Sequence, residues 1–501
     1  MLNIKKNISL LCISGFSCCC YASTRPNIIY ILADDLGYAE LGCYGQEKIE
    51  TPNIDLLSSS GIRFTQHYSG TAVSGPSRCV LLTGKHTGHA YIRGNDEMQS
   101  RGDVWSHAAM LADSSLEGQR PIPGSTFTLA KLMKQVGYAT ACIGKWGLGY
   151  PGSESTPNKM GFDFFYGYNC QRQAHTYYPP FLYRNESREY LDNELLPPGT
   201  KLEKNADVLS AESYAKYNQK VYAPDLMFTE ITNFIDNHKK DPFFIMWTTP
   251  LPHVPLQAPQ RWVDYYVNKF GDESPYTCQK GYFPCRYPHA TYAAMISYWD
   301  EQIGLLIEQL KSLGLYENTL IIFTSDNGPT FNGGSDSPWF DSAKPFKSDA
   351  GWGKASIREG GIRVPMIACW PKEIKAGSTS DHISAFWDVL PTLADITSQK
   401  VQDTDGISFL PTLRGKKQKK HDYLYWEYPE GTGSKAIRMG KWKGLIKDIK
   451  KGNTTLELYD LSIDPQEQNN LALQYPDIVN KLTLKMQQAH TPPAISQFKM
   501  P

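Results

Sequence analysis

The sequence predicts an α/β protein in which helices cover both faces of a sheet, and its pattern of apolar runs leads to that fold class. Short runs rich in Ile, Val and Phe, typical of buried strands, lie at residues 27–34, 243–249, 319–328 and 364–371. Residues 298–314 carry apolar side chains at helical spacing and end at a glycine. Strands that are interleaved with helices in this way favour a layered α/β fold.

The last part of the chain predicts a second, smaller domain. After a basic stretch at 409–420, which suits a linker, antiparallel strands are expected at 423–429, 435–446 and 454–461, and a helix at 476–489. The aromatic residues at 425–429 suit either the face of a sugar or a packed core. We therefore expect a large domain over residues 23–415 and a C-terminal α+β subdomain over residues 416–501.

The first residues have the pattern of a secretory signal peptide over residues 1–22. Lys5 and Lys6 precede an apolar run, and small residues follow for cleavage after Ala22. A buried N-terminal helix is the alternative. Cys18–Cys20 would allow a lipoprotein anchor, but no leucine stands three residues ahead of them, which favours a secreted protein.

Charge and cysteine content exclude several classes of protein. Loss of Lys5 and Lys6 leaves 49 of the 51 basic side chains against 51 acidic ones, so no basic stripe for nucleic acid is expected. No later segment is apolar over the roughly 20 residues that a transmembrane helix needs. The seven remaining cysteines form no CxxC pair, which argues against a zinc cage. Cys278 and Cys285 would allow a disulfide outside the cytoplasm.

Two predicted strands end in oxygen ligands. Asp34 and Asp35 follow the run at 27–34, and Asp326 and Asn327 follow the run that begins at residue 319. Either pair alone is more often a loop or a helix cap. Because ligands gather at the carboxyl ends of strands in α/β sheets, two such pairs together predict a site for a hard cation such as Ca²⁺ or Mg²⁺.

Three basic side chains share this placement after strands. Lys145 lies in a glycine-rich turn, His253 lies between prolines, and Lys354 precedes a pair of glycines. Taken singly, each lysine is typical of a solvated surface and the histidine of a structural role. Their common position favours a cationic pocket for an anionic ester.

The segment "SGPSRCVLLTG" begins at Ser74, two residues before Pro76 and four before Arg78. It resembles the signature of the sulfatase family, which has an alkaline-phosphatase-like fold with a large mixed sheet sandwiched by helices. The segments "RPNIIYILADDLGY", "GKWGLG", "PHVPLQAP", "FTSDNGP" and "GKASIREGGIRVP" match further blocks of the family in order. The resemblance runs from about Pro26 to "LYDLSIDPQEQNNLA".

The resemblance implies a sulfuric ester hydrolase that carries a modified serine. A serine-type sulfatase-maturing enzyme, helped by Ser77 and Arg78, would oxidise Ser74 to formylglycine (3-oxoalanine). One hydroxyl of the aldehyde hydrate would attack sulfur, and the second would release sulfate. One Ca²⁺ ion would be held by Asp34, Asp35, Asp326, Asn327 and modified Ser74. Arg78 would stabilise the hydrate, His253 would act as general acid, and the sulfate would be bound by Lys145, Lys354 and His253.

One position departs from the family pattern. Many relatives have a histidine two residues after the lysine of "GKWGLG", where this chain has Gly147, so the role of that histidine has to be supplied elsewhere. His175 is the candidate substitute and substrate ligand, although a single histidine among tyrosines also suits packing. A serine-type sulfatase with a signal peptide implies a bacterial periplasmic enzyme for sulfated saccharides. The segment "NCQRQAHTYYP" suggests galactose or N-acetylgalactosamine sulfate as the substrate.

Two alternatives stay open from the sequence. A phosphatase or phosphodiesterase of the same superfamily would use an unmodified Ser or Thr and two zinc ions with several histidine ligands, whereas only His253 lies in a strong motif here. An inactive protein that binds sulfated glycans would need a broken site, and only Gly147 points to one.

Overall fold

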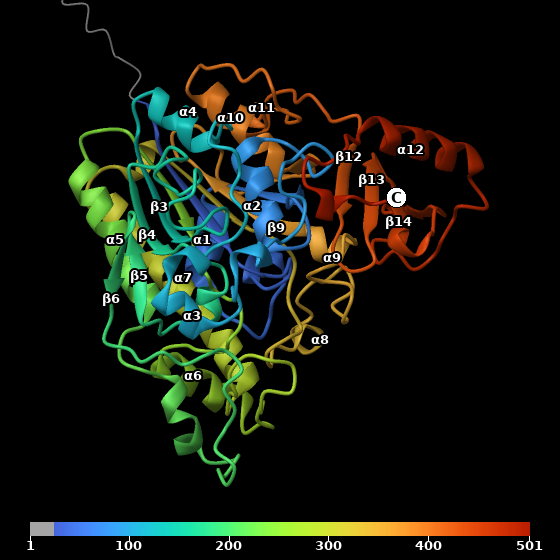
Figure 1. Ribbon diagram of the computed structural model, residues 1–501. Helices are drawn as coiled ribbons and strands as arrows, with labels where there is room; N and C mark the ends of the chain where they lie inside the picture. The colour runs from blue at the N-terminus through green and yellow to red at the C-terminus, as the bar shows by residue number, and fades with distance from the viewer. Residues whose placement is uncertain (1–24) are drawn as a thin grey trace, which may run out of the picture.

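The computed structural model describes residues 25–501, so the predicted signal peptide over residues 1–22 lies outside the described residues. The larger of its two sheets has eleven strands in the order β10-β2-β9-β8-β1-β7-β3-β4-β5-β6, with β11 paired to β2. These strands are β1 (Asn27–Ala33), β2 (Ile62–Tyr68), β3 (Ala139–Lys145), β4 (Phe164–Tyr168), β5 (Phe181–Arg184), β6 (Ser187–Tyr190), β7 (Phe243–Thr248), β8 (Thr319–Ser325), β9 (Arg363–Cys369), β10 (Ser378–Ser380) and β11 (Ser384–Ala385). The neighbouring strands β3, β4, β5 and β6 are labelled in Figure 1. Within residues 25–501, no helix is long and apolar enough to cross a membrane.

The four strands expected from the sequence are β1, β7, β8 and β9, and they form the centre of this sheet. β1 lies between β7 and β8 and is parallel to both. β9 is antiparallel to β8 and to β2. The sheet is therefore mixed, and the predicted α/β fold class with a large mixed sheet is confirmed.

Helices lie on both sides of the sheet. They are α1 (Pro52–Ser59), α2 (Ser74–Thr83), α3 (His107–Ala112), α4 (Leu129–Gln135), α5 (Ala223–His238), α6 (Gln260–Phe270), α7 (Pro288–Ser312), α8 (Ser337–Phe340), α9 (Glu359–Ile362), α10 (Val389–Ile396) and α11 (Leu410–Leu413). α7 begins ten residues before the expected start at residue 298. Its first half is buried nearly all round, so it has no exposed polar face that would reveal the helical period in the sequence.

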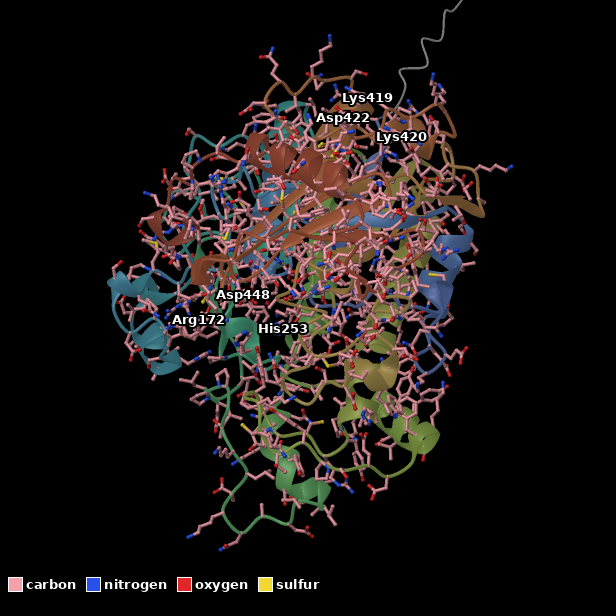
Figure 2. The ribbon with its side chains drawn as sticks, turned by 90° about the vertical axis from the view of Figure 1, so that its right-hand side faces the viewer. Arg172, His253, Lys419, Lys420, Asp422 and Asp448 are labelled. Carbon is pink, nitrogen blue, oxygen red and sulfur yellow. The ribbon has the colours of Figure 1, made fainter. Side chains whose placement is uncertain are left out.

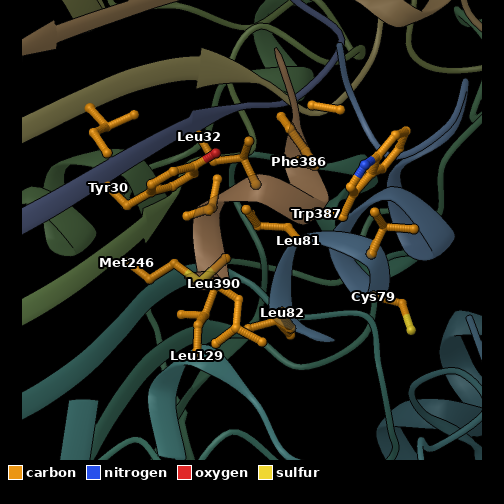
Figure 3. Close-up of a cluster of buried hydrophobic side chains, with 14 of the residues drawn as sticks. Tyr30, Leu32, Cys79, Leu81, Leu82, Leu129, Met246, Phe386, Trp387 and Leu390 are labelled. Carbon is orange, nitrogen blue, oxygen red and sulfur yellow. The ribbon is translucent and has the colours of Figure 1, made fainter. Parts of the chain in front are cut away.

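Alternate residues of β1 pack into two separate cores. Tyr30 and Leu32 contribute to a cluster with residues of α2, α4 and α10, including Leu81 and Leu390 (Figure 3). Ile29 and Ile31 belong to the core on the opposite face, with residues of α1, α5 and α7. Each such side chain contributes roughly 1.5–3 kcal/mol when fully buried. The packing of α2 against the sheet fixes the position of the first residue of α2, Ser74.

The C-terminal part forms a four-stranded antiparallel sheet, β12 (Leu424–Tyr428), β13 (Ser434–Met439), β14 (Trp442–Ile446) and β15 (Glu457–Asp460), with α12 (Pro476–Gln488) packed against β13 and β14 (Figure 1). Of the two interpretations of the aromatic residues at 425–429, the packed core holds and the sugar face is wrong, because Tyr425 and Trp426 are fully buried. The Trp426 indole donates to the Ser69 carbonyl oxygen at 3.1 Å and so joins this sheet to the large domain. The boundary at residues 415 and 416 stays a prediction.

The disulfide that the sequence allowed between Cys278 and Cys285 is not formed, and both thiols are free. Cys285 Sγ donates to Thr291 Oγ1 at 3.3 Å, whereas Cys278 Sγ donates to the Gly199 carbonyl oxygen at 3.5 Å. The two side chains therefore bond to different parts of the chain.

Candidate active site

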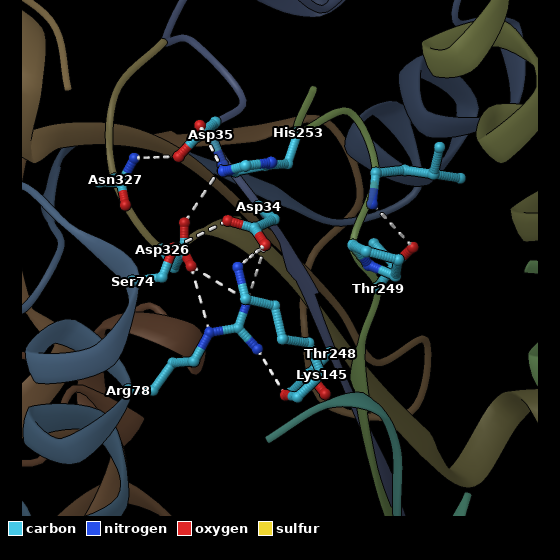
Figure 4. Close-up of polar contacts among 12 residues, drawn as sticks. Asp34, Asp35, Ser74, Arg78, Lys145, Thr248, Thr249, His253, Asp326 and Asn327 are labelled. Atoms are coloured by element: carbon cyan, nitrogen blue, oxygen red, sulfur yellow. Dashed lines mark hydrogen bonds and ion pairs between the residues drawn. The ribbon is translucent and has the colours of Figure 1, made fainter. Parts of the chain in front are cut away.

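The expected site residues meet where the parallel strands of the large sheet end. Asp34 directly follows β1, Asp326 directly follows β8, and Lys145 is the last residue of β3. His253 follows β7 by five residues. The Asp34 N–H donates to the Leu251 carbonyl oxygen and the Asp326 N–H to that of Ala33, so the segments beyond the strands stay joined. Figure 4 shows the side chains of the site gathered at this edge. This is the edge at which α/β sheets bind their ligands.

The acidic residues are linked to one another by hydrogen bonds. Asn327 Nδ2 donates to Asp35 Oδ1 at 2.7 Å, and the Asp35 N–H donates to Asp326 Oδ1 at 3.2 Å. Ligand atoms of Asp34, Asp35 and His253 lie within 4.8 Å of one another. Asp35 has a left-handed backbone with φ of 66°, a strained conformation for a residue with a side chain, which is common at functional sites.

Ser74 lies beside this acidic cluster. The Ser74 hydroxyl donates to Asp34 Oδ1 at 2.8 Å, and Ser74 is almost fully buried at the first turn of α2. Ser77 Oγ donates to the Asp326 carbonyl oxygen at 2.6 Å. Arg78 Nη2 bonds to Asp326 Oδ2 at 3.0 Å, and Arg78 Nη1 donates to the Lys145 carbonyl oxygen. The motif that begins at Ser74 is thus anchored to the strand ends by its own following residues.

Each carboxylate of this cluster has a cationic partner. Lys145 Nζ bonds to Asp34 Oδ2, and Lys354 Nζ bonds to Asp35 Oδ2 at 2.7 Å. Arg78 pairs with Asp326 and approaches Asp34 Oδ2 to 3.6 Å. The three carboxylates are fully buried, so removing a cationic partner would leave an uncompensated buried charge.

Burial opposes ionisation of all three carboxyl groups of the cluster, and the cations beside them offset that effect unequally. Burial would raise the pKa of Asp34, but Lys145 and Arg78 hold that pKa well below its usual range. Burial raises the pKa of Asp326 to about 6, with the Asp34 charge adding to the effect. Burial also raises the pKa of Asp35 against the opposing effect of Lys354. An added cation would relieve this competition.

One buried oxygen in the cluster has no partner. Asn327 Oδ1 accepts no hydrogen bond within the described residues, although the Nδ2 group of the same side chain makes two. Buried polar atoms normally have a hydrogen-bond partner, so an oxygen without one needs an explanation. Carboxylate and amide oxygens are the ligands that hard cations take. The predicted set of Asp34, Asp35, Asp326 and Asn327 therefore fits a cation.

His253 and His175 form a stacked pair. Their rings are 5.3 Å apart and inclined by 6°, and Tyr282 meets both rings edge-on. His253 Nε2 lies 3.6 Å from Asp35 Oδ2, and its Nδ1 contacts the Val254 carbonyl oxygen. Burial lowers the pKa of His253 well below its usual value, and the nearby Lys354 lowers it further. His253 is therefore neutral in the site as described.

The site opens into a cavity of about 730 Å³. Ser74, Lys145, His253 and Lys354 lie on its floor, and His175 also lines it. Its walls come from residues that sequence reasoning missed, among them Asn95, Asp96, Glu97, Trp105, Arg120, Gln171, Arg172, Tyr282 and Glu430. Arg172 and His253 lie on the same side of the molecule (Figure 2). The wall residues lie mostly in irregular segments, whose folding is set by distant contacts and leaves no period in the sequence.

Gln171 occupies the space beside Gly147. A Cβ added at Gly147 would come within 2.5 Å of Gln171 Cγ, and Gly147 has a φ of 80°, which strains any other residue. His175, the expected substitute for the missing histidine, lies against His253 instead. Gln171 is therefore the polar side chain that fills the space beside Gly147. The one sequence signal for it was its place in the same segment as His175, four residues earlier.

A second group of possible metal ligands lies outside this site and consists of His86, His89 and Asp405. His89 Nδ1 is hydrogen-bonded to Asp405 at 2.9 Å, and Asp405 Oδ2 accepts the His86 N–H at 3.0 Å. His86 Nδ1 accepts the Gly88 N–H, and the two imidazoles stack on each other at 4.4 Å. These contacts explain the group as a hydrogen-bonded connection between two segments of the chain.

Comparison with known proteins gives a consistent match along the chain. The profile of the Sulfatase family matches residues 26–399, and that of the N-sulphoglucosamine sulphohydrolase C-terminal region matches residues 350–491. An N-acetylgalactosamine-6-O-sulfatase of Bacteroides thetaiotaomicron is 29% identical over 526 residues, covering 94% of each chain. Human arylsulfatase A is 29% identical over 487 residues, covering 89% of this chain and 83% of its own length.

Solved structures agree with these sequence matches. The crystal structure of Ps i-CgsB superposes with a TM-score of 0.72 at 27% identity and covers 94% of both chains. The same protein has been solved in complex with k-i-k-neocarrahexaose.

Proposed function

Because the chain belongs to the sulfatase family, we propose that it removes sulfate from O-sulfated carbohydrates with a nucleophile made from Ser74. The chain is a sulfuric ester hydrolase, as its family and named relatives indicate. The observation that carries the specific proposal is the position of Ser74. Its hydroxyl bonds to Asp34 on the floor of a cavity that also exposes Lys145, Lys354 and His253.

The substrate class follows from the relatives. One of them is an N-acetylgalactosamine-6-O-sulfatase, and Ps i-CgsB has been solved with k-i-k-neocarrahexaose. We propose a galactose or N-acetylgalactosamine sulfate within a saccharide as the substrate. The predominantly polar cavity supports a hydrophilic ligand of this kind.

We propose that one Ca²⁺ ion is held by Asp34, Asp35, Asp326 and Asn327 together with the modified Ser74. The unpaired Asn327 Oδ1 and the all-oxygen ligand set support this assignment. Three carboxylates face three cationic side chains here, so the protein groups alone are balanced. A bound divalent ion would supply two excess positive charges, which stabilise an anionic ester and lower the pKa of a nearby hydroxyl.

A plain serine cannot complete the reaction. After sulfate transfer to a serine hydroxyl, no second hydroxyl on the same carbon would be present to expel the sulfate. We therefore propose that a serine-type maturing enzyme oxidises Ser74 to formylglycine. When hydrated, this aldehyde supplies two hydroxyls on one carbon. Arg78, which is fixed between Asp326 and the Lys145 carbonyl oxygen, lies where it would orient them.

His253 would supply the proton for the leaving alcohol. The Val254 carbonyl oxygen can only accept a hydrogen bond, so His253 carries its proton on Nδ1 when it is neutral, and Nε2 is then basic. Burial and Lys354 keep the pKa of His253 low in the free enzyme. An anionic sulfate beside Nε2 raises that pKa and favours the protonated acid. Lys145 and Lys354 would hold the sulfate oxygens.

For location, we propose secretion into a bacterial periplasm after removal of residues 1–22. The basic, apolar and small-residue order of that segment supports this route over a lipoprotein anchor.

The proposed function is tested by offering sulfate and phosphate esters to protein co-expressed with a serine-type maturing enzyme. Release of inorganic sulfate from galactose 6-sulfate or N-acetylgalactosamine 6-sulfate supports it. Release of phosphate alone from nitrophenyl phosphate would move the chain to the phosphatase class. Binding of sulfated sugars without turnover would leave only the glycan-binding alternative.

A further inference from the structure

We infer that the substrate carries its sulfated sugar next to an uncharged sugar, whose ring lies on Trp105 and whose hydroxyls bond to carboxylates of the cavity wall. This inference rests on the proposed function. It assigns specificity to the wall of the cavity, which takes no part in the chemistry at Ser74.

The cavity is larger than one sulfated sugar needs. Its volume of about 730 Å³ lies in the upper part of the range of about 300–1,000 Å³ that encloses drug-sized ligands. Trp105 lines it and belongs to the segment just before α3. A second sugar ring therefore has room in the same cavity.

Trp105 offers a platform for that ring. It is 56% exposed, which is unusual for the largest aromatic side chain. The buried Arg172 guanidinium lies 5.5 Å from its ring centroid, so the indole is supported from the protein side. An exposed, rigid aromatic face that lines a cavity binds apolar C–H surfaces, such as the face of a sugar ring, at low entropic cost.

The charges of the wall select against a second anion. Arg120 pairs with Asp96, and Arg172 pairs with Glu97. Glu430, contributed by the C-terminal part of the chain, accepts the Asn95 N–H at 2.6 Å. Among the described residues that line the cavity, each arginine thus has a carboxylate partner. A uronic acid or a second sulfate in this region would face carboxylates without a spare cation.

The same wall can form hydrogen bonds with the hydroxyls of an uncharged sugar. Carboxylates accept hydrogen bonds from sugar hydroxyls, and an amide both donates and accepts. Gln171 is 8% exposed and lines the cavity, and its side-chain amide has no hydrogen-bond partner among the described residues. Its Nε2 lies 3.1 Å from the position that a Cβ of Gly75 would take, next to Ser74. The wall thus offers hydrogen bonds to an uncharged neighbour close to the sulfated ring.

The test compares three substrates with the matured enzyme: a sulfated monosaccharide, the same sugar linked to a neutral hexose, and the same sugar linked to a uronic acid. We expect kcat/KM at least tenfold higher for the neutral disaccharide than for the uronate. Trp105→Ala should lower kcat/KM for the neutral disaccharide about tenfold and change that for the monosaccharide less than twofold. Glu430→Gln keeps an acceptor for the Asn95 N–H. It should lower the ratio of kcat/KM for the neutral disaccharide to kcat/KM for the uronate disaccharide several-fold.

Tyr190→Ala is the matched control, because Tyr190 is 67% exposed and lies outside the cavity lining. Equal rates on the neutral and uronate disaccharides would overturn the inference, as would equal losses on all three substrates in Trp105→Ala. If no substrate is turned over, the proposed function fails. The inference is then tested separately, by calorimetric measurement of how tightly Ser74→Ala binds each of the two disaccharides. Tighter binding of the neutral disaccharide, weakened about tenfold by Trp105→Ala, supports it, and tighter or equal binding of the uronate overturns it.

Discussion

The Ser74 hydroxyl lies 2.8 Å from Asp34 Oδ1, although the two residues belong to different elements, the first turn of α2 and the end of β1. Asp34 in turn bonds to Lys145 at the end of β3. Three elements thus bring together the proposed nucleophile, a proposed cation ligand and a lysine proposed to bind sulfate.

Asp35→Ala should abolish sulfatase activity and remove the stabilisation that calcium gives. A ligand at one hundred times its Kd stabilises the folded protein by about 2.7 kcal/mol, so calcium should raise the Tm of the wild type and not that of the variant. Calorimetric scans with calcium and with chelator check this. Asp341→Ala, an exposed acid in another segment, is the control. Full activity in Asp35→Ala would refute the cation site.

His253→Ala should lose rate according to the leaving group. General acid catalysis contributes about 100-fold to 10,000-fold when the leaving alcohol is poor. We expect a loss of at least about 100-fold in kcat/KM on a sugar sulfate and less than about tenfold on nitrophenyl sulfate, whose leaving group needs no proton. Equal losses on both substrates would instead make His253 a positioning residue.

Glu40 should make stability depend on pH. Burial raises the pKa of this fully buried carboxyl to about 7, although it accepts hydrogen bonds from the Gly37 N–H and the Tyr292 hydroxyl. A raised folded-state pKa gives stability that is present below about pH 4.5 and is lost as pH rises through 7, by about 3 kcal/mol in total. The Tm of Glu40→Gln should therefore improve relative to wild type between pH 5 and pH 8. A difference that stays constant with pH would contradict this assignment.

Glu427→Ala should weaken the attachment of the C-terminal sheet. Glu427 Oε2 bonds to Arg93 Nη1 at 2.9 Å, and both side chains are almost fully buried. Removing one partner of a buried ion pair costs about 3–5 kcal/mol, which urea unfolding can measure. Asp448→Ala breaks the exposed pair with Lys451 and should cost less than about 1 kcal/mol. Similar midpoints for the two variants would show that the buried pair contributes little.

The centre of the fold and the floor of the site could be predicted from the sequence for one physical reason. β1 and β8 are buried on both faces, so each appears as a mainly apolar run, and the first acidic residue after it, Asp34 or Asp326, follows directly on the strand end. Parallel pairing then requires those ends to meet, because Ala33 is in register with Ser325.

The cavity wall could not be predicted in this way. Asp96, Glu97 and Trp105 lie in a segment with almost no regular structure, and Gln171 is set by the space that Gly147 leaves. Glu430 reaches the cavity only because the C-terminal sheet docks through buried contacts such as Trp426 with Ser69. Such placements depend on tertiary contacts between distant segments, which leave no local pattern.

The central claim is that Ser74 acts only after oxidation to an aldehyde, and the mass of the peptide that contains "SGPSR" tests it most directly. Protein made with a serine-type maturing enzyme should hydrolyse a sugar sulfate and show a loss of about two mass units on this peptide, because the aldehyde has two hydrogens fewer than serine. Protein made without that enzyme should bind the sugar sulfate but not turn it over. Full activity with the unmodified mass of Ser74 would contradict the account.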